Sequence, residues 1–156
     1  MSTAGWSSSS EKRLDAVAGG LPVEPPQDAL AARAVSLEGV SVLLVEDSWH
    51  IAVALKSLLE NAGLVVDGPA GSLARANALL DQRAPDLAIV DINIKGRMSF
   101  DLIDRLAERC VPVIVVSGYD ETARLEGKVA ASLQKPIRAG ELLAALRRVV
   151  MTRTAS

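Results

Sequence analysis

The sequence contains only one cysteine, one histidine and, at 3%, few aromatic residues. The single cysteine, Cys110, excludes an internal disulfide and is typical of a protein kept in a reducing compartment. Because Cys110 follows an apolar helical pattern, we expect a packed and unreactive thiol. The one histidine, His50, has no second nitrogen or sulfur donor near it, which argues against a zinc site.

Long apolar runs and long runs of one charge are also missing. The longest unbroken apolar run, residues 111–116, is too short to cross a bilayer, and the N-terminus lacks the features of a secretory signal. Lys and Arg number 17 against 19 Asp and Glu, so the formal net charge is only -2 and no basic run attracts nucleic acid. These absences predict a cytoplasmic protein that binds neither membranes nor nucleic acid.

The composition of the chain changes at about residue 39. Residues 1–38 hold four consecutive serines, a Gly-Gly pair and three prolines, too polar a mixture to offset the entropy of ordering. We therefore expect a flexible N-terminal tail at 1–38, one domain at 39–152 and a short C-terminal tail at 153–156. No output domain is expected after the last helix.

Within this domain, short β-branched runs alternate with segments whose apolar residues recur every three or four positions. The strand candidates are residues 40–45, 64–67, 87–90, 113–116 and, more weakly, 131–133. The helix candidates are residues 51–62, 73–80, 100–107, a short segment at 123–129, and 139–150. This alternation predicts an α/β fold, with a five-stranded parallel sheet and helices on both faces.

Polar residues that can carry chemistry stand where the strands end. They are Glu46 and Asp47 after the first strand, Asp91 at the third, Ser117 at the fourth and Lys135 at the fifth. In open parallel sheets, ligands bind outside these carboxyl ends. Three carboxylates repel one another unless a cation is present, and a donor set made of oxygens favours Mg²⁺ over Zn²⁺.

Asp91 is the candidate nucleophile, because its carboxylate could attack phosphorus and form an acyl phosphate. Lys135 and Mg²⁺ would then neutralise the charge of the phosphoryl oxygens during transfer. Ser117 could donate a hydrogen bond to the product. These roles predict a phosphoryl acceptor site at one edge of the sheet.

In this order, the motifs resemble the receiver domains of two-component response regulators. The resemblance covers about residues 40–150 and rests on Glu46-Asp47, Asp91-Ile92-Asn93 with Gly96, Ser117-Gly118, and Lys135-Pro136. It implies a flavodoxin-like (βα)5 doubly wound fold with strand order 2-1-3-4-5, an order that receivers share. It also implies a histidine kinase or histidine phosphotransferase as phosphoryl donor.

The resemblance assigns a role to each site residue. Asp91 is the phosphoacceptor, and Mg²⁺ is held by Asp47, Asp91 and the backbone carbonyl of Asn93, while Glu46 acts through a coordinated water. Ser117 and Lys135 complete the set, and the Lys135-Pro136 bond is cis. Such a protein signals by contact with a downstream protein and is not an enzyme beyond its own phosphorylation and dephosphorylation.

Ser117-Gly118-Tyr119 and Leu133-Gln134-Lys135-Pro136 look like the FATGUY-type subgroup of receivers, many of which consist of this domain alone. Two departures are Val115-Val116-Ser117 in place of Phe-Ala-Thr, and Asp120 where a glycine is common. Most receivers also have an aromatic residue three positions before the lysine, where this chain has Ser132. We therefore hypothesise that phosphorylation acts by ordering residues 119–129, with the role of Tyr119 left open.

Two other classes of protein remain as alternatives. One is a pseudo-receiver, a binding module that keeps the fold and signals without phosphorylation; the intact Asp91, Ser117 and Lys135 argue against it. The other is an enzyme, either an aspartate-based phosphohydrolase or a nucleotide-binding oxidoreductase. The first strand is not followed by the glycines that a nucleotide pyrophosphate needs, and residues 91–93 lack the second aspartate that aspartate-based phosphatases have.

Trp49, two positions after the acidic pair, is expected to be a packing residue.

Overall fold

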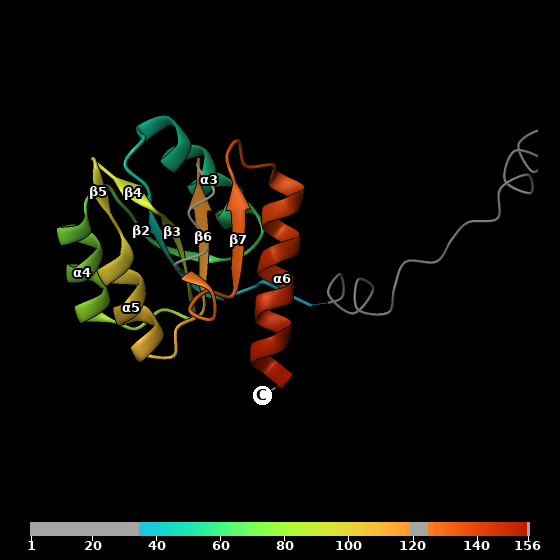
Figure 1. Ribbon diagram of the computed structural model, residues 1–156. Helices are drawn as coiled ribbons and strands as arrows, with labels where there is room; N and C mark the ends of the chain where they lie inside the picture. The colour runs from blue at the N-terminus through green and yellow to red at the C-terminus, as the bar shows by residue number, and fades with distance from the viewer. Residues whose placement is uncertain (1–34, 119–124, 156) are drawn as a thin grey trace, which may run out of the picture. The chain divides into compact units, whose positions relative to one another are not determined.

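Five parallel strands form the central sheet of the computed structural model, which describes residues 35–118 and 125–155 (Figure 1). The strands are β1 (Ser41–Val45), β2 (Val65–Ala70), β3 (Leu87–Asp91), β6 (Val113–Ser117) and β7 (Ala131–Gln134). Their order across the sheet is β2-β1-β3-β6-β7, and every neighbouring pair is parallel. Counted along these five strands, this order is the predicted 2-1-3-4-5, so the flavodoxin-like fold is confirmed.

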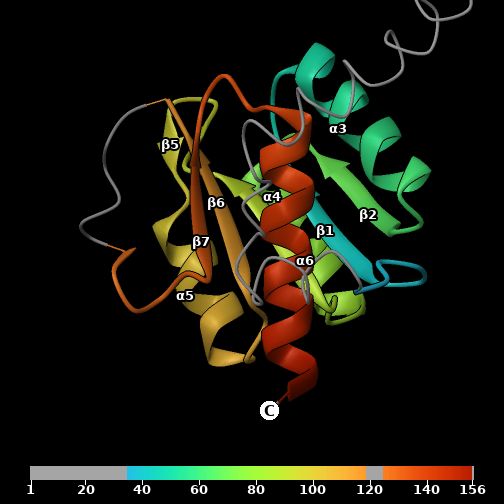
Figure 2. The same ribbon diagram turned by 90° about the vertical axis from the view of Figure 1, so that its right-hand side faces the viewer.

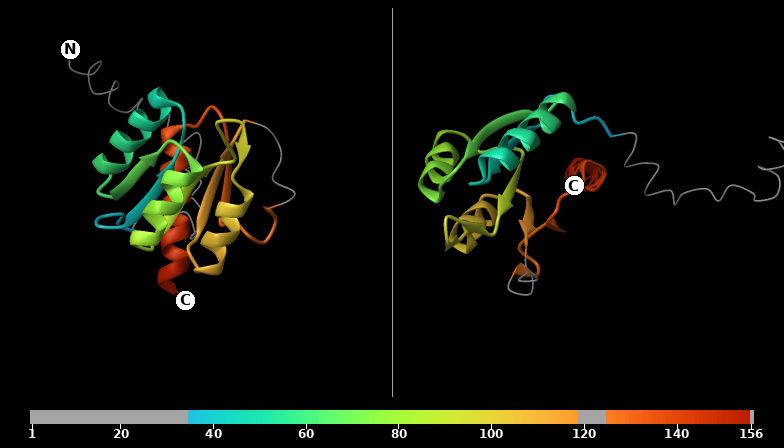
Figure 3. Two further views of the ribbon diagram at one scale, coloured as in Figure 1. Left: turned by 90° about the vertical axis from the view of Figure 1, so that its left-hand side faces the viewer. Right: turned by 90° about the horizontal axis from the view of Figure 1, so that it is seen from above.

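Four helices cover the two faces of the sheet (Figures 2 and 3). They are α3 (Trp49–Asn61) and α6 (Ala139–Ala155) on one face, and α4 (Leu73–Gln82) and α5 (Phe100–Glu108) on the other. Along β3, Leu87 and Ile89 pack toward α3 and α6, whereas Ala88 and Val90 pack toward α4 and α5. Because both faces are covered, β3 is apolar at every position before its last residue.

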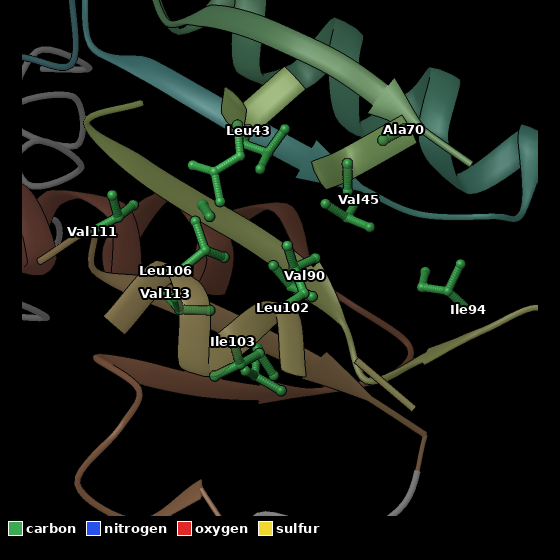
Figure 4. Packing of buried hydrophobic residues seen from close by; sticks show 14 of the residues in the cluster. Leu43, Val45, Ala70, Val90, Ile94, Leu102, Ile103, Leu106, Val111 and Val113 are labelled. Atoms are coloured by element: carbon green, nitrogen blue, oxygen red, sulfur yellow. The ribbon is translucent and has the colours of Figure 1, made fainter. Parts of the chain in front are cut away.

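The core on the α4 and α5 side shows why these segments are helical (Figure 4). Leu102, Ile103 and Leu106 lie on one stripe of α5 and are at most 2% exposed against the sheet. Burial of each such side chain contributes about 1.5–3 kcal/mol. At the start of α4, the Ser72 hydroxyl accepts the backbone N–H of Arg75, so a cap and an apolar stripe together define this helix.

The folded domain begins earlier, and its last helix ends later, than the sequence predicts. Leu37 is already buried in the core, two residues before the expected domain start at residue 39. The periodicity predicts a last helix that ends near residue 150 and a tail from 153, but α6 continues to Ala155. Its last turn is held to the sheet because Arg153 Nη1 donates to the backbone oxygen of Asp86 at 2.6 Å and to its carboxylate at 3.0 Å.

Two of the predicted segments lie partly or largely outside the described residues. These are the expected tail at 1–38, of which only residues 35–38 are described, and residues 119–124 of the segment that holds Tyr119 and the short helix. From Leu125 on, the chain turns, and the N–H of Lys128 donates to the Leu125 carbonyl at 2.9 Å. No helix in the described part of the chain is long and apolar enough to cross a membrane.

A small antiparallel hairpin, absent from the prediction, follows β3. It consists of β4 (Asn93–Ile94) and β5 (Arg97–Met98), joined by the two residues Lys95 and Gly96. Both have positive φ, +53° and +79°, as a type I′ turn requires. This hairpin lies beyond the carboxyl end of β3 (Figure 1) and therefore borders the predicted site.

Candidate functional site

Glu46, Asp47, Asp91 and Lys135 come together at the carboxyl ends of the strands. Lys135 Nζ lies 2.7 Å from Asp91 Oδ2 and 3.2 Å from Glu46 Oε1, so one ammonium group bridges two carboxylates. β1 lies next to β3, and the long lysine side chain reaches them from the end of β7. Residues that are up to 89 positions apart in sequence therefore meet at one edge of the sheet.

Glu46 is the most unusual of these groups, because it is 3% exposed and yet only partly satisfied. Its Oε1 accepts from Lys135, but its Oε2 is buried and has no hydrogen-bond partner among the described residues. Burial, followed by the neighbouring carboxylate of Asp91, raises the pKa of Glu46 from its ordinary value of 4.5 to about 7, although Lys135 opposes the shift. The site therefore has less positive charge than its carboxylates need.

Lys135 is the one cation in direct contact with these acids among the described residues. Burial alone would lower its pKa, but the hydrogen bond and charge of Asp91, and then those of Glu46, outweigh burial and raise it. The amine therefore stays protonated across the physiological range. One positive charge faces two buried carboxylates and the exposed Asp47.

The donor set fits a hard divalent cation. One oxygen from each of Glu46, Asp47 and Asp91 lies within 4.8 Å of the others, a spacing that a bound ion can bridge. The orphaned Oε2 of Glu46 needs a partner, and the three carboxylates need a counter-charge. Oxygen ligands without imidazole or thiolate favour Mg²⁺. His50 is exposed and does not belong to this cluster.

The backbone around Asp91 is held by Ser99, a residue that the sequence analysis missed. The Ser99 hydroxyl, fully buried, lies 2.5 Å from the carbonyl oxygen of Asp91 and 2.9 Å from that of Ile92. The N–H of Asn93 donates to Asp91 Oδ1 at 3.1 Å. Both carboxylate oxygens of Asp91 are thus oriented, one by this amide and the other by Lys135.

Asp47 also has a partner that the sequence did not reveal. The backbone N–H of Lys95, at the tip of the β4–β5 hairpin, donates to Asp47 Oδ2 at 2.8 Å. The N–H of Gly96 donates to Asn93 Oδ1 at 2.9 Å within the same hairpin. A backbone amide of this kind leaves little trace in sequence, although the Lys95-Gly96 pair is a turn signal that could have been read.

The remaining predicted residues lie at or near the same edge. Ser117 ends β6, is 4% exposed, and its carbonyl accepts the N–H of Lys135 at 2.8 Å. The Lys135-Pro136 peptide bond is cis, as expected. Asn93 is exposed, two residues beyond Asp91.

Two expectations about side-chain burial are wrong. Trp49 is expected to pack but is 71% exposed, at the first residue of α3 and before the buried residues of that helix, which begin at Ala52. Cys110 is expected to be a buried thiol but is exposed, since it lies just beyond the end of α5 in a left-handed conformation with φ +58°. Neither residue contributes to the cluster of acids.

Comparison with known proteins gives consistent matches. A family model described as "Response regulator receiver domain" matches residues 42–147. The photosynthetic apparatus regulatory protein RegA of Cereibacter sphaeroides is 32% identical over 112 residues, which are 68% of this chain and 60% of RegA. The KDP operon transcriptional regulatory protein KdpE of Escherichia coli is 36% identical over 112 residues, 69% of this chain and 49% of KdpE.

Solved structures agree with the sequence relatives. The non-phosphorylated receiver domain of HemR from Leptospira biflexa is 27% identical, with a TM-score of 0.65, and the match covers 71% of this chain and 94% of that one. This chain therefore spans nearly all of an isolated receiver structure. It spans only 49–60% of the two curated relatives.

Proposed function

Since this chain belongs to the response regulator receiver domain family, we propose that it accepts a phosphoryl group on Asp91 in a Mg²⁺-dependent reaction. The donor is a histidine kinase or a histidine phosphotransferase. The observation that carries this proposal is the contact of Lys135 Nζ with Asp91 Oδ2 at 2.7 Å, inside a cluster of three acids that this one ammonium group does not balance. A nucleophilic carboxylate and a fixed cation in contact are what phosphoryl transfer needs from a protein.

The transfer forms one bond and breaks one. A carboxylate oxygen of Asp91 attacks the phosphorus of a phosphohistidine, the new O–P bond forms, and the P–N bond to the imidazole breaks. The imidazole nitrogen leaves with the bonding pair and takes up a proton from solvent. The product is an acyl phosphate on Asp91, and water later attacks it to release inorganic phosphate.

The surrounding residues stabilise charge and hold geometry. Lys135 stays protonated and places its ammonium group beside the oxygen that becomes part of the phosphorylated carboxylate. Ser117, at the end of β6, would donate its hydroxyl to a phosphoryl oxygen. Asp47, Asp91 and the Asn93 carbonyl would hold Mg²⁺, and Glu46 would act on it through a water; the ion would supply the positive charge that the phosphoryl oxygens and the acids require.

Partners and location follow from the same proposal. The domain takes its phosphoryl group from a histidine-containing donor in the cytoplasm and passes the signal on through contact with another protein. Trp49, two residues after Asp47, has a 71% exposed side chain, which such a donor would contact in this proposal.

Labelling with a small phosphoryl donor tests the proposal. Wild type incubated with acetyl phosphate and Mg²⁺ should give a shifted, hydroxylamine-sensitive band on a phosphate-affinity gel, and Asp91→Asn should give none. Asp104→Asn is the matched control, because Asp104 is an exposed aspartate that pairs with Lys128 away from the site. Equal labelling of wild type and Asp91→Asn would refute the proposal. A folded wild type that never labels would instead favour a phosphorylation-independent binding module.

A further inference from the structure

We propose that the β4–β5 hairpin (residues 93–98) positions Asp47 for metal binding, through the backbone N–H of Lys95. This inference rests on the proposed function, because it concerns the same Mg²⁺ site. It adds a positioning element that the predicted ligand set does not include. The hairpin links two acids that belong to different strands, Asp91 at the end of β3 and Asp47 after β1.

Asp47 needs such a partner because it is exposed, unlike Glu46 and Asp91. An exposed carboxylate samples several rotamers, and fixing it at the moment of metal binding costs entropy. The N–H of Lys95 donates to Asp47 Oδ2 at 2.8 Å, so the side chain is already oriented and its other oxygen remains available for a cation. Outer-shell contacts of this kind strengthen metal binding because they orient the ligand beforehand.

The turn at the tip of the hairpin directs the Lys95 N–H toward Asp47. Lys95 and Gly96 both have positive φ, which a type I′ turn requires and which a residue other than glycine adopts only under strain. The N–H of Gly96 donates to Asn93 Oδ1 at 2.9 Å and closes the turn from inside. A Cβ at Gly96 would meet no atom within 4 Å, so the need for glycine here is conformational and not steric.

The base of the hairpin is fixed to Asp91. Ile94 is 1% exposed and belongs to the core cluster, where Figure 4 shows it at the outer end, beyond Val45 and Val90. The Ser99 hydroxyl bonds to the carbonyl oxygens of Asp91 and Ile92, immediately before the hairpin. Since the base is held by the core and the tip holds Asp47, the distance between the two acids depends on the hairpin.

A pair of matched glycine variants tests this role. Gly96→Val strains the turn, and we expect it to raise the dissociation constant of Mg²⁺ about tenfold, the lower end of the effect of outer-shell partners. Gly39→Val is the control: Gly39 has φ +77°, a Cβ added there would also meet no atom within 4 Å, and it precedes β1 at the other end of the sheet. It should lower the urea midpoint to a similar extent and leave the Mg²⁺ dissociation constant within about twofold of wild type.

Two further variants separate the backbone amide from the side chains. Lys95→Gly keeps the N–H and the positive φ but removes the ammonium group, so Mg²⁺ affinity should stay within about twofold of wild type. Asn93→Ala keeps the backbone carbonyl and removes the acceptor of the Gly96 N–H. It should weaken Mg²⁺ binding by about threefold, and it covers the case in which Gly96→Val fails to fold.

Isothermal titration calorimetry with Mg²⁺ alone gives the readout for each variant. The inference is overturned when wild type binds Mg²⁺ but Gly96→Val, or Asn93→Ala if the former does not fold, binds it as tightly as Gly39→Val. Wild type that binds Mg²⁺ without labelling on Asp91 would overturn the proposed function and leave the inference intact. Wild type without measurable Mg²⁺ binding would overturn both.

Discussion

Strand β3 has an aspartate at each end, and the two carboxylates have opposite surroundings. Asp86, just before the strand, accepts the N–H of Ser41 at 2.9 Å, the Ser41 hydroxyl at 3.2 Å and Arg153 at 3.0 Å. The Ser41 N–H, with help from its hydroxyl and from Arg153, lowers the pKa of Asp86 despite some burial. This end of the sheet has a full set of donors for its carboxylate.

At the other end, Asp91 and Glu46 share one ammonium group, and Glu46 Oε2 has no partner in the described part of the chain. Burial, together with the neighbouring Asp91, raises the pKa of Glu46 to about 7. An acid whose hydrogen bonds are all made stabilises a fold, whereas buried acids with too little positive charge mark a place where a ligand is expected. The comparison therefore separates a structural carboxylate before β3 from the carboxylates of the candidate site at its other end.

The strongest way to break this comparison is to remove the shared cation. Lys135→Met keeps much of the apolar stem and deletes the charge, and it should slow labelling by acetyl phosphate about 10²-fold, since fixed charges at such sites have effects of this size. Lys128→Met removes an exposed lysine that pairs with Asp104 and should label at the wild-type rate. A Lys135→Met rate within about threefold of wild type would mean that the contact with Asp91 does not assist transfer.

Loss of Asp86, the structural aspartate, should lower stability and leave labelling on Asp91 unchanged. Asp86→Ala removes the acceptor for Ser41 and Arg153, so we expect the free energy of unfolding to fall by about 1 kcal/mol, limited by the partial exposure of the carboxylate. Urea denaturation measures the loss, and labelling on Asp91 should be unchanged. Asp104→Ala, which breaks an exposed pair, should change stability by less than about 0.5 kcal/mol. A labelling defect in Asp86→Ala would show that the two ends are coupled.

The sequence was sufficient for most of the fold because its signals were local and repeated. Apolar strands followed by amphipathic helices predicted the sheet and the edge where Glu46, Asp91 and Lys135 meet. The order of the strands came from the family resemblance. The ends of elements were less predictable. α6 extends to Ala155 because of a contact between Arg153 and Asp86, 67 residues away, and no local pattern reports such a contact.

The parts of the site that the sequence missed are made by the backbone and by one small hydroxyl. Lys95 acts on Asp47 through its N–H, so its side-chain type gives no indication of the contact. In the sequence, Ser99 is only a common residue type before a helix, and nothing there indicates that its hydroxyl donates to the Asp91 carbonyl. Trp49 was misjudged because residue type predicts burial only on average, and its position on the helix decides otherwise.

The contributions of Glu46 and Asp86 to stability should also change with pH in opposite directions when metal is absent. A raised pKa means that the contribution of Glu46 to stability is fully present below pH 4.5 and is lost as the pH rises through about 7. In EDTA, wild type should therefore lose stability relative to Glu46→Gln over this range, and saturating Mg²⁺ should abolish the loss. The lowered pKa of Asp86 has the reverse sign, with stability lost as the pH falls through and below the ordinary range of an aspartate.

Urea midpoints measured from well below pH 3.8, the ordinary pKa of an aspartate, to above pH 7, with EDTA and with Mg²⁺, test both signs. Asp86→Asn is the second matched variant, because it should remove only the loss of stability at low pH. Parallel pH curves for wild type and Glu46→Gln in EDTA would contradict the assignment of Glu46 as the undersatisfied acid.

The smallest expected effect concerns two non-glycine residues with positive φ, one at each end of the molecule's sheet. Lys95 is held there by the hairpin beside the site, whereas Cys110 follows α5 at the far end with φ +58° and contacts no functional group described above. A left-handed conformation costs an L-residue about 1–2 kcal/mol, and glycine avoids this at an entropic cost of about 0.5–1 kcal/mol. Cys110→Gly should therefore raise the free energy of unfolding by about 0.5–1 kcal/mol in urea denaturation and leave labelling unchanged, while Cys110→Ala should not stabilise; equal stability of the two variants would show that the strain at Cys110 is already relieved.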